Sequence, residues 1–146
     1  MKKFPALLVG MLLGAAMPAM AADPAPAAAP AAAPAELISQ SDLLARLGRK
    51  DTDLVVLDVR TPAEFAAGHV PGARNVSHDQ LPAKLAELSS LKDKEVVLYC
   101  RSGRRSAIAA ETLRGAGFSK LRHLEGDWLA WEAEKKPVET SPAVTN

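Results

Sequence analysis

Cysteine is almost absent from this chain of 146 residues, in which Cys100 is the only one. A single cysteine excludes any disulfide within the chain, so no cross-link of that kind contributes to the fold. The lone thiol therefore needs another reason to be present, and catalysis or sulfur carriage supplies one. The alternatives are an intermolecular disulfide or a small buried side chain that packs at the end of a strand.

An excess of charge of one sign is also missing. Lys and Arg number 18 against 17 Asp and Glu, which gives a formal net charge of +1. A chain this close to neutral offers no general basis for binding nucleic acid or a membrane surface. No second His or Cys lies near His69 at the spacing of metal ligands, so we expect no metal site and no cofactor.

The N-terminus carries the features of an export signal. Met1–Lys3 is basic, Phe4–Ala16 is apolar and uncharged, and Ala19-Met20-Ala21 supplies small residues before a cleavage site. This pattern predicts a bacterial secretory signal peptide over residues 1–21, with an uncleaved anchor as the alternative. Cleavage removes two lysines, so the formal net charge falls from +1 to about −1. We therefore expect a periplasmic protein with no membrane association after cleavage.

The rest of the chain divides by composition. Residues 22–35 are nearly all Ala and Pro, which is typical of an extended, disordered linker. Residues 36–138 alternate apolar strand patterns with helical patterns, and residues 139–146 form a polar tail. The alternation predicts one α/β domain, a three-layer sandwich in which a mostly parallel sheet carries helices on both faces.

Local signals place several elements of this domain. Ser39 or Ser41 is a suitable N-cap for a helix that ends at Gly48. Thr61, with Pro62 and Glu64 after it, has the spacing of a capped helix start. Leu81, Leu85 and Leu88 predict one apolar face of a further helix. Strands are expected over residues 36–39, 54–60, 95–99 and 121–124.

The segment around Cys100 carries the chemistry. It follows the apolar run 95–99 and precedes a segment of helical periodicity from Ser106, so the cysteine lies where a strand turns into a helix. Backbone N–H groups and the positive end of the helix dipole then converge on one point, which can also hold an anion. Polar and basic neighbours argue against burial of this thiol. We expect it to be largely thiolate, the nucleophilic form.

The sequence of this loop, Cys-Arg-Ser-Gly-x-Arg-Ser from Cys100, resembles the active-site loop of the rhodanese (sulfurtransferase) family. The stretch from Leu57 to Val76 is similar to the family's N-terminal signature, L-D-V-R-x-x-x-E-F-x-x-G-H-V-P-G-A-x-N-V. The stretch from Glu125 resembles its L-E-G-G-x-x-x-W ending, except that Asp127 stands where the second Gly is usual. Asp tolerates a positive φ better than most residues. The resemblance extends from about Glu36 to about Val138.

The resemblance implies a rhodanese-like fold and a thiosulfate sulfurtransferase. The Cys100 thiolate would take the outer sulfur of a small anionic donor such as thiosulfate, form a persulfide and release sulfite. A thiol or cyanide acceptor, or a protein thiol partner, would then remove that sulfur. The loop that binds the anion comprises Arg101, Ser102, Gly103, Arg104, Arg105 and Ser106. Arg101 and Arg105 match the family's recurrent basic positions, but spacing does not tell which arginine points inward.

Two further residues are candidates for supporting the site. Asp58, at the end of a strand, is expected to orient basic residues, as the resemblance suggests. Arg60 either supports the site or makes a structural ion pair with Glu64 or Asp58. His69 lies in a turn rich in Gly and Pro, where we expect a structural hydrogen bond rather than a general base.

Two other functions are compatible with the sequence. Cysteine-dependent phosphatases and arsenate reductases use Cys-x5-Arg, and here Ser106 occupies the position of that arginine, so the loop is one residue short. The second alternative is a periplasmic persulfide carrier or redox partner with little turnover of its own. Slow turnover of thiosulfate combined with rapid transfer to a protein thiol would indicate the carrier.

Overall fold

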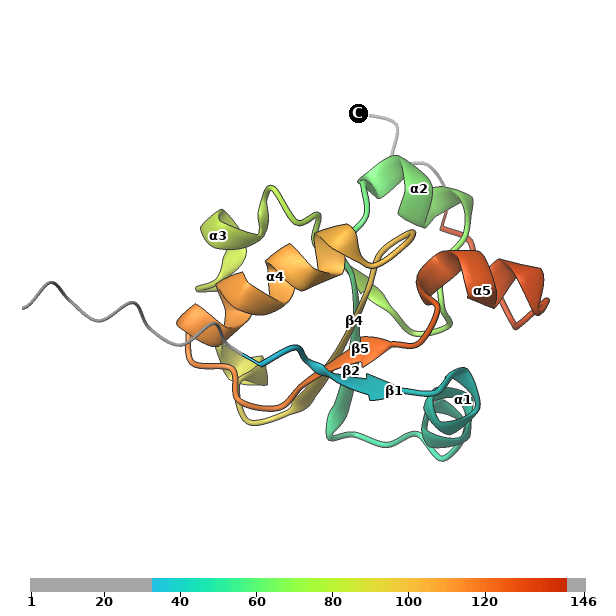
Figure 1. Cartoon of the computed structure of the whole chain (residues 1–146), viewed down its shortest axis with the longest axis horizontal. Coiled ribbons are helices and arrows are strands. Elements are labelled where there is room, and N and C mark those ends of the chain that lie inside the picture. Colours follow the sequence, from blue (N-terminus) through green and yellow to red (C-terminus); the bar gives the residue numbers. More distant parts are fainter. Residues whose placement is uncertain (1–32, 142–146) are drawn as a thin grey trace, which may run out of the picture. The chain divides into compact units, whose positions relative to one another are not determined.

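The computed structural model describes residues 33–141, so the predicted signal peptide lies outside the described residues. Strands and helices alternate along the described chain (Figure 1). The strands are β1 (Glu36–Ile38), β2 (Leu54–Asp58), β3 (Arg74–Asn75), β4 (Glu95–Tyr99) and β5 (Leu121–Leu124). The helices are α1 (Gln40–Gly48), α2 (Pro62–Ala67), α3 (Leu81–Lys84), the 3-10 turn η1 (Ser89–Leu91), α4 (Arg104–Gly115) and α5 (Asp127–Ala133).

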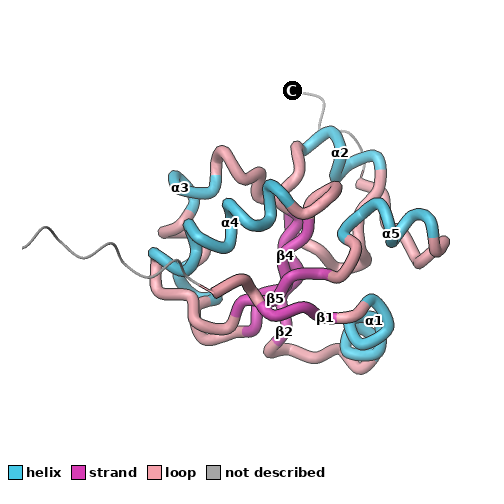
Figure 2. The backbone as a smooth tube through the Cα atoms, viewed as in Figure 1, coloured by secondary structure: helices cyan, strands magenta, loops and turns pink. Residues whose placement is uncertain are grey.

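The strands form one sheet in the order β1-β5-β4-β2-β3. Every pair of neighbouring strands is parallel. The central strand β4 lies between β2 and β5, so its carboxyl end is flanked by the ends of both neighbours (Figure 2). The predicted parallel α/β sheet is confirmed.

Side chains of β4 alternate between two cores. Val96 and Leu98 belong to a buried cluster that includes Leu113 of α4, on the face covered by α3 and α4. Val97 and Tyr99 belong to a second cluster on the opposite face, and its members from α1 and α5 are Leu43, Trp128 and Trp131. The sheet therefore has helices on both faces, as the three-layer prediction requires (Figure 1).

The starts of α1 and α2 follow the predicted capping signals. The Ser39 hydroxyl accepts the N–H of Asp42 at 3.1 Å and begins α1. At α2, the Thr61 hydroxyl accepts the N–H of Glu64, and the Glu64 carboxylate accepts the N–H of Thr61. This reciprocal pair satisfies two of the amide groups that a helix start leaves without an internal partner.

The helix predicted around Leu81, Leu85 and Leu88 is only partly right. Helix α3 ends at Lys84, and the chain continues through turns into η1. No side chain caps the start of α3, and so short a helix depends on packing more than on its own hydrogen bonds. Leu81 and Leu88 are both buried nonetheless. The apolar pattern thus predicts burial correctly and helix length incorrectly.

Contacts of the domain continue beyond residue 138, where the polar tail is predicted to begin. The backbone of Glu139 exchanges two hydrogen bonds of 2.9 Å with that of His69. Ser141 donates its N–H to the carbonyl of Ala66 at 3.3 Å. Within residues 33–141, no helix is both long and apolar enough to cross a membrane.

Candidate active site at the carboxyl end of the central strand

The loop after β4 is folded so that one of its amides points at the cysteine sulfur. Gly103 has φ +104°, a backbone conformation that residues with a Cβ rarely adopt. Its N–H donates to the Sγ of Cys100 at 3.0 Å. Helix α4 begins at the next residue, so the positive end of its dipole lies beside the same sulfur.

Cys100 is more buried than the sequence indicates. The residue is only 1% exposed, so the expectation of an unburied thiol is wrong. The physical reason is that the alternation of β4 continues one residue past the strand. Cys100 therefore faces the same side as Val96 and Leu98, in the cluster under α4. Its sulfur still has polar neighbours, namely the Gly103 amide and the Ser106 hydroxyl at 3.7 Å.

A carboxylate and an imidazole that the sequence did not single out for the site lie beside this loop. Asp127 is 5% exposed, and its Oδ1 accepts the N–H of Cys100 at 2.9 Å. Its Oδ2 lies 2.8 Å from Nε2 of His123, and that nitrogen is 3.1 Å from the Ser106 hydroxyl. Two signals could have found them: His123 lies one residue before the end of β5, the strand next to β4, and Asp127 stands where the family usually has glycine.

Asp127, which stands where the family motif usually has its second glycine, adopts a backbone conformation that is typical of glycine. Its φ is +51°, in the left-handed region that Asp tolerates, as predicted. The next two amides of α5 hold the cysteine loop: Trp128 donates to the carbonyl of Cys100 at 3.0 Å and Leu129 to that of Arg101 at 3.2 Å. Together with the Asp127 carboxylate, this helix start fixes the first two residues of the loop.

Asp58 and Arg60 form a buried ion pair. The guanidinium donates to Asp58 at 2.6 to 3.0 Å, and the Tyr99 hydroxyl donates to the same carboxylate at 2.7 Å. Burial opposes the charge of Arg60, but the hydrogen bonds and charge of Asp58 outweigh it and raise the pKa of Arg60. Of the two partners considered for Arg60, the structure shows Asp58. The guanidinium also lies 4.4 Å over the ring of Trp128.

The partner of Glu64 is instead Arg105, from the first turn of α4. Two guanidinium nitrogens donate to its carboxylate at 2.8 and 3.0 Å. The hydrogen bond from Arg105 is the main cause that lowers the pKa of Glu64 to about 2, with further contributions from Thr61. The pKa of Arg105 is raised chiefly by Glu64, with a smaller contribution from Cys100. The ion pair therefore connects α2 to the loop and engages an arginine predicted to bind the donor.

The ion pair of Glu64 with Arg105 makes the stability of the fold depend on pH. The folded pKa of Glu64, about 2, lies below the ordinary pKa of 4.5 for a free glutamate, so the stabilisation is complete above pH 4.5 and is lost as the pH falls toward 2. We expect the difference in Tm between the natural protein and Glu64→Gln to be constant from pH 7 to about 5 and to shrink below it. Thermal unfolding across this range measures it. A gap that does not change down to pH 2 would contradict the assignment.

His69 has the structural role predicted for it. It is 4% exposed, and its Nδ1 lies 2.8 Å from the carbonyl of Phe65. Its ring stacks on that of Phe65 with a centroid distance of 3.7 Å. These contacts hold the turn after α2. Among residues 33–141, no group of three or more His, Cys, Asp or Glu side chains is placed to hold a metal ion.

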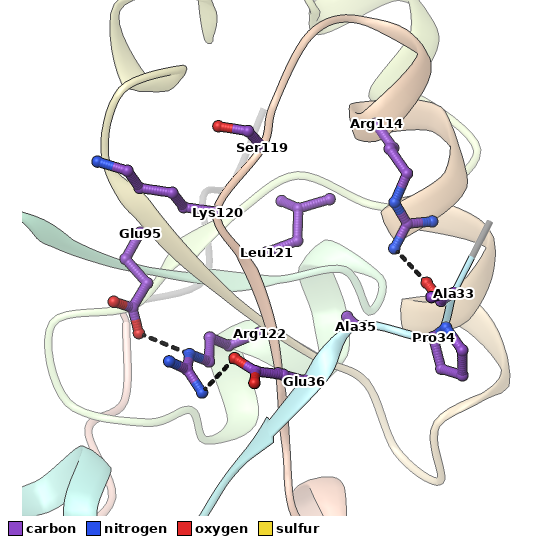
Figure 3. Close-up of a pocket in the computed structure, with 10 residues that line it drawn as sticks. All are labelled: Ala33, Pro34, Ala35, Glu36, Glu95, Arg114, Ser119, Lys120, Leu121 and Arg122. Carbon is purple, nitrogen blue, oxygen red and sulfur yellow. Dashed lines mark hydrogen bonds and ion pairs between the residues drawn. The ribbon is translucent and has the colours of Figure 1, made fainter.

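Two hollows lie at opposite ends of the sheet. The first, of about 250 Å³, adjoins the cysteine loop and is lined by Arg60, Glu64, Arg101 and Trp128 among others. The second, of about 440 Å³, lies where β1, β4 and β5 begin (Figure 3). Arg122 forms ion pairs with Glu36 and Glu95 in its lining, which includes no residue of the predicted site. Of these two hollows, the first is therefore the one that adjoins the predicted site.

The comparisons with known proteins agree with this architecture. Residues 39–134 match the family model of the rhodanese-like domain. The chain belongs to the rhodanese-like family. The match spans the helix α1, the cysteine loop and the whole of α5, so the family assignment covers every residue of the site described above.

Curated relatives of this rhodanese-like chain include sulfurtransferases. It is 36% identical to a sulfurtransferase of Allochromatium vinosum over 101 residues, which are 69% of this chain and 92% of the relative. It is 40% identical to the uncharacterized protein YqhL of Bacillus subtilis over 91 residues, or 62% of this chain and 69% of that one.

Solved structures with the same fold carry two kinds of description. A rhodanese-related protein from Thermoplasma volcanium has a TM-score of 0.62 and 30% identity, covering 73% of this chain and 99% of that one. A protein of unknown function from Rhodopseudomonas palustris, described as a possible tyrosine phosphatase, has a TM-score of 0.65 and 30% identity. The match covers 72% of this chain and 85% of that one. The fold is thus shown, and the choice of reaction depends on the loop.

Proposed function

We propose that this rhodanese-like protein transfers sulfane sulfur from a small anionic donor such as thiosulfate to a thiol acceptor, through a persulfide on Cys100, in the periplasm. The observation that carries the proposal is the amide of Gly103 directed at the sulfur at 3.0 Å, at the start of α4. An oriented amide and a helix N-terminus stabilise an anion on sulfur without any rearrangement of the loop.

The transfer has two displacement steps. In the first, the Cys100 thiolate attacks the outer sulfur of thiosulfate, the new S–S bond forms, and sulfite leaves with the electron pair of the old bond. In the second, an acceptor thiolate attacks the outer sulfur of the persulfide, and Cys100 leaves as the thiolate. The sulfur that Cys100 presents is anionic before and after the cycle, so the same amide serves both steps.

The exposed arginines of the loop supply positive charge for the donor. Arg101 and Arg104 are both exposed, whereas Arg105 is engaged by Glu64. Only Arg101 among them lines the hollow beside the loop. We therefore place the donor anion against Arg101, where charge-assisted hydrogen bonds can form.

Sulfur uptake tests the proposal directly. After incubation with thiosulfate, the intact mass of the protein is expected to rise by one sulfur atom, and a thiol acceptor is expected to reverse the gain. An unchanged mass with thiosulfate and other sulfane donors would overturn the proposal. If uptake occurs but turnover is slow while a protein thiol discharges the sulfur rapidly, the protein is a carrier rather than a general sulfurtransferase.

A phosphate ester assayed on the same sample tests the phosphatase alternative. Ser106 stands where a phosphatase loop has its arginine, and the Ser106 hydroxyl donates to the carbonyl of Gly103 at 2.9 Å. The neighbouring Arg105 is held by Glu64. The arginine position of the phosphatase loop is therefore a serine in this chain, and we expect no hydrolysis of the ester.

The two exposed arginines give a matched pair of variants. Arg101→Ala is expected to raise the KM for thiosulfate about 10-fold, because it removes a charged contact to the donor, whereas Arg104→Ala should change it about 2-fold or less. Steady-state rates over a range of thiosulfate concentrations measure both. Equal effects of the two variants would show that the loop attracts the donor by its summed charge rather than through Arg101.

A further inference from the structure

A third hollow, of about 370 Å³, lies between the start of α1 and the helix α5, which cover the same face of the sheet (Figure 1). Its lining comes from residues 39–41, from residues 125–126 before α5, and from Ala130, Glu134 and Lys136. None of the residues of the cysteine loop takes part in this lining, so the hollow is separate from the site described above.

Gln40, in the lining of this hollow, has a buried side-chain oxygen that accepts no hydrogen bond. The residue is only 7% exposed, and its Nε2 donates to the carbonyl of Glu125 at 3.2 Å. Its Oε1 has no donor in the part of the chain that the structure describes. Buried polar atoms are nearly always paired, so this oxygen indicates a place for a donor. The last torsion of a glutamine side chain is soft, so Oε1 can tilt toward a donor in the hollow.

The carboxylates of the hollow determine which kind of donor fits. Glu134 is paired with Lys136 at 3.1 Å, so these two charges offset each other. Glu125 is exposed, and none of the ion pairs within residues 33–141 includes it. Oε1 of Gln40 and the carboxylate of Glu125 are therefore two acceptors in one lining, with one negative charge between them. A ligand that satisfies both supplies several N–H groups and a positive charge, as a primary ammonium group does.

Two other classes of ligand fit this hollow less well. An anion would compete with the chain itself for the start of α1, where the Ser39 hydroxyl accepts the N–H of Asp42 and donates to the Asp42 carboxylate. The positive end of the helix dipole thus already faces a negative charge. A divalent metal ion takes about six or more oxygen ligands. Among the described residues, no group of three or more His, Cys, Asp or Glu side chains is placed to hold one.

We propose that the hollow between α1 and α5 binds a small primary alkylammonium ion. The N–H groups of the ion donate to Oε1 of Gln40 and to the carboxylate of Glu125, and its alkyl chain lies against the side chain of Ala130. The inference is independent of the proposed function, because no residue of the cysteine loop lines the hollow.

Two cations of equal charge test the site on the natural protein. Butylammonium carries N–H donors, whereas tetramethylammonium carries none. Each is added at constant ionic strength, and the backbone amide signals are followed by two-dimensional NMR, which also detects weak binding. We expect butylammonium to shift the signals of residues 39–41 and 125–126 and to bind about 10-fold more tightly than tetramethylammonium. Equal binding of the two cations, or shifts confined to other parts of the chain, would overturn the proposal.

Variants of the two acceptors test the contacts themselves. Glu125→Gln removes the charge with little change of shape, and Gln40→Leu removes the buried oxygen; each is expected to weaken the binding of butylammonium about 10-fold. Glu87→Gln, which removes an exposed carboxylate outside this lining, is the control and should bind like the natural protein.

Undiminished binding by Glu125→Gln or by Gln40→Leu would contradict the proposal. So would calcium chloride, if it shifted the same signals at lower concentration than butylammonium, because the site would then be a metal site. Gln40→Leu also loses the hydrogen bond to the carbonyl of Glu125. Should that variant not fold, Glu125→Gln and the comparison of the two cations decide the question.

Discussion

Cys100→Ser is expected to take up no sulfur from thiosulfate and to lose sulfurtransferase activity by about 10³-fold or more. The substitution changes one atom in a residue that is 1% exposed, so packing against the cluster under α4 is largely kept. A serine hydroxyl does not ionise near neutral pH, and the Gly103 amide then has no anion to stabilise. Intact mass after donor treatment and steady-state turnover measure the two losses.

The control for this variant is its stability. Cys100→Ser should unfold at a Tm close to that of the natural protein, because the Gly103 amide at 3.0 Å and the Ser106 hydroxyl can satisfy the new oxygen. Retained sulfur uptake in the variant would show that the added mass is not on Cys100. That result would remove the central residue from the mechanism while leaving the family assignment intact.

Asp58→Asn is expected to destabilise the fold by about 3 kcal/mol, which lowers Tm by on the order of 10 °C in a domain of this size. Asp58 is 0% and Arg60 3% exposed, so the variant leaves a guanidinium charge buried without its counter-charge. The Tyr99 hydroxyl, which donates to the same carboxylate at 2.7 Å, also loses its anionic acceptor. Urea unfolding with a constant m-value measures the loss.

Glu87→Gln is the matched control, since it removes the carboxylate of an exposed ion pair. Glu87 lies 3.0 Å from Lys84, and the two side chains are 66% and 44% exposed. Pairs so exposed contribute little, so this variant should change stability by less than about 0.5 kcal/mol. If both variants lost a similar amount of unfolding free energy, burial would not be the reason that the Asp58–Arg60 pair stabilises the fold.

The elements of the sheet could be predicted because their signals are local. A continuous apolar run predicts β4, and the capping residues Thr61 and Glu64 predict the start of α2. The length of the helix at α3 was predicted incorrectly, because the spacing of its leucines indicates only that they are buried. Turns can bury these side chains as well as a helix can. The signal peptide and the periplasmic location stay predictions.

The site was only partly predictable, because its remaining contacts depend on strand order. The order β1-β5-β4-β2-β3 places β5 beside β4, and only this brings His123 to Ser106. The pairing of Arg105 with Glu64 joins residues that are 41 positions apart. The burial of Cys100 likewise follows from the alternation of β4 and not from the polar residues beside it.

The depth of Cys100 has a consequence for which reagents its thiol can meet. Because Cys100 is only 1% exposed, direct attack of its thiol by the cysteine of a second copy of the chain is sterically disfavoured while the loop keeps this conformation. Compact reagents gain an advantage over bulky ones, which makes the loop a steric filter for the chemistry beneath it. The presence of a single cysteine and its burial thus both disfavour disulfide formation.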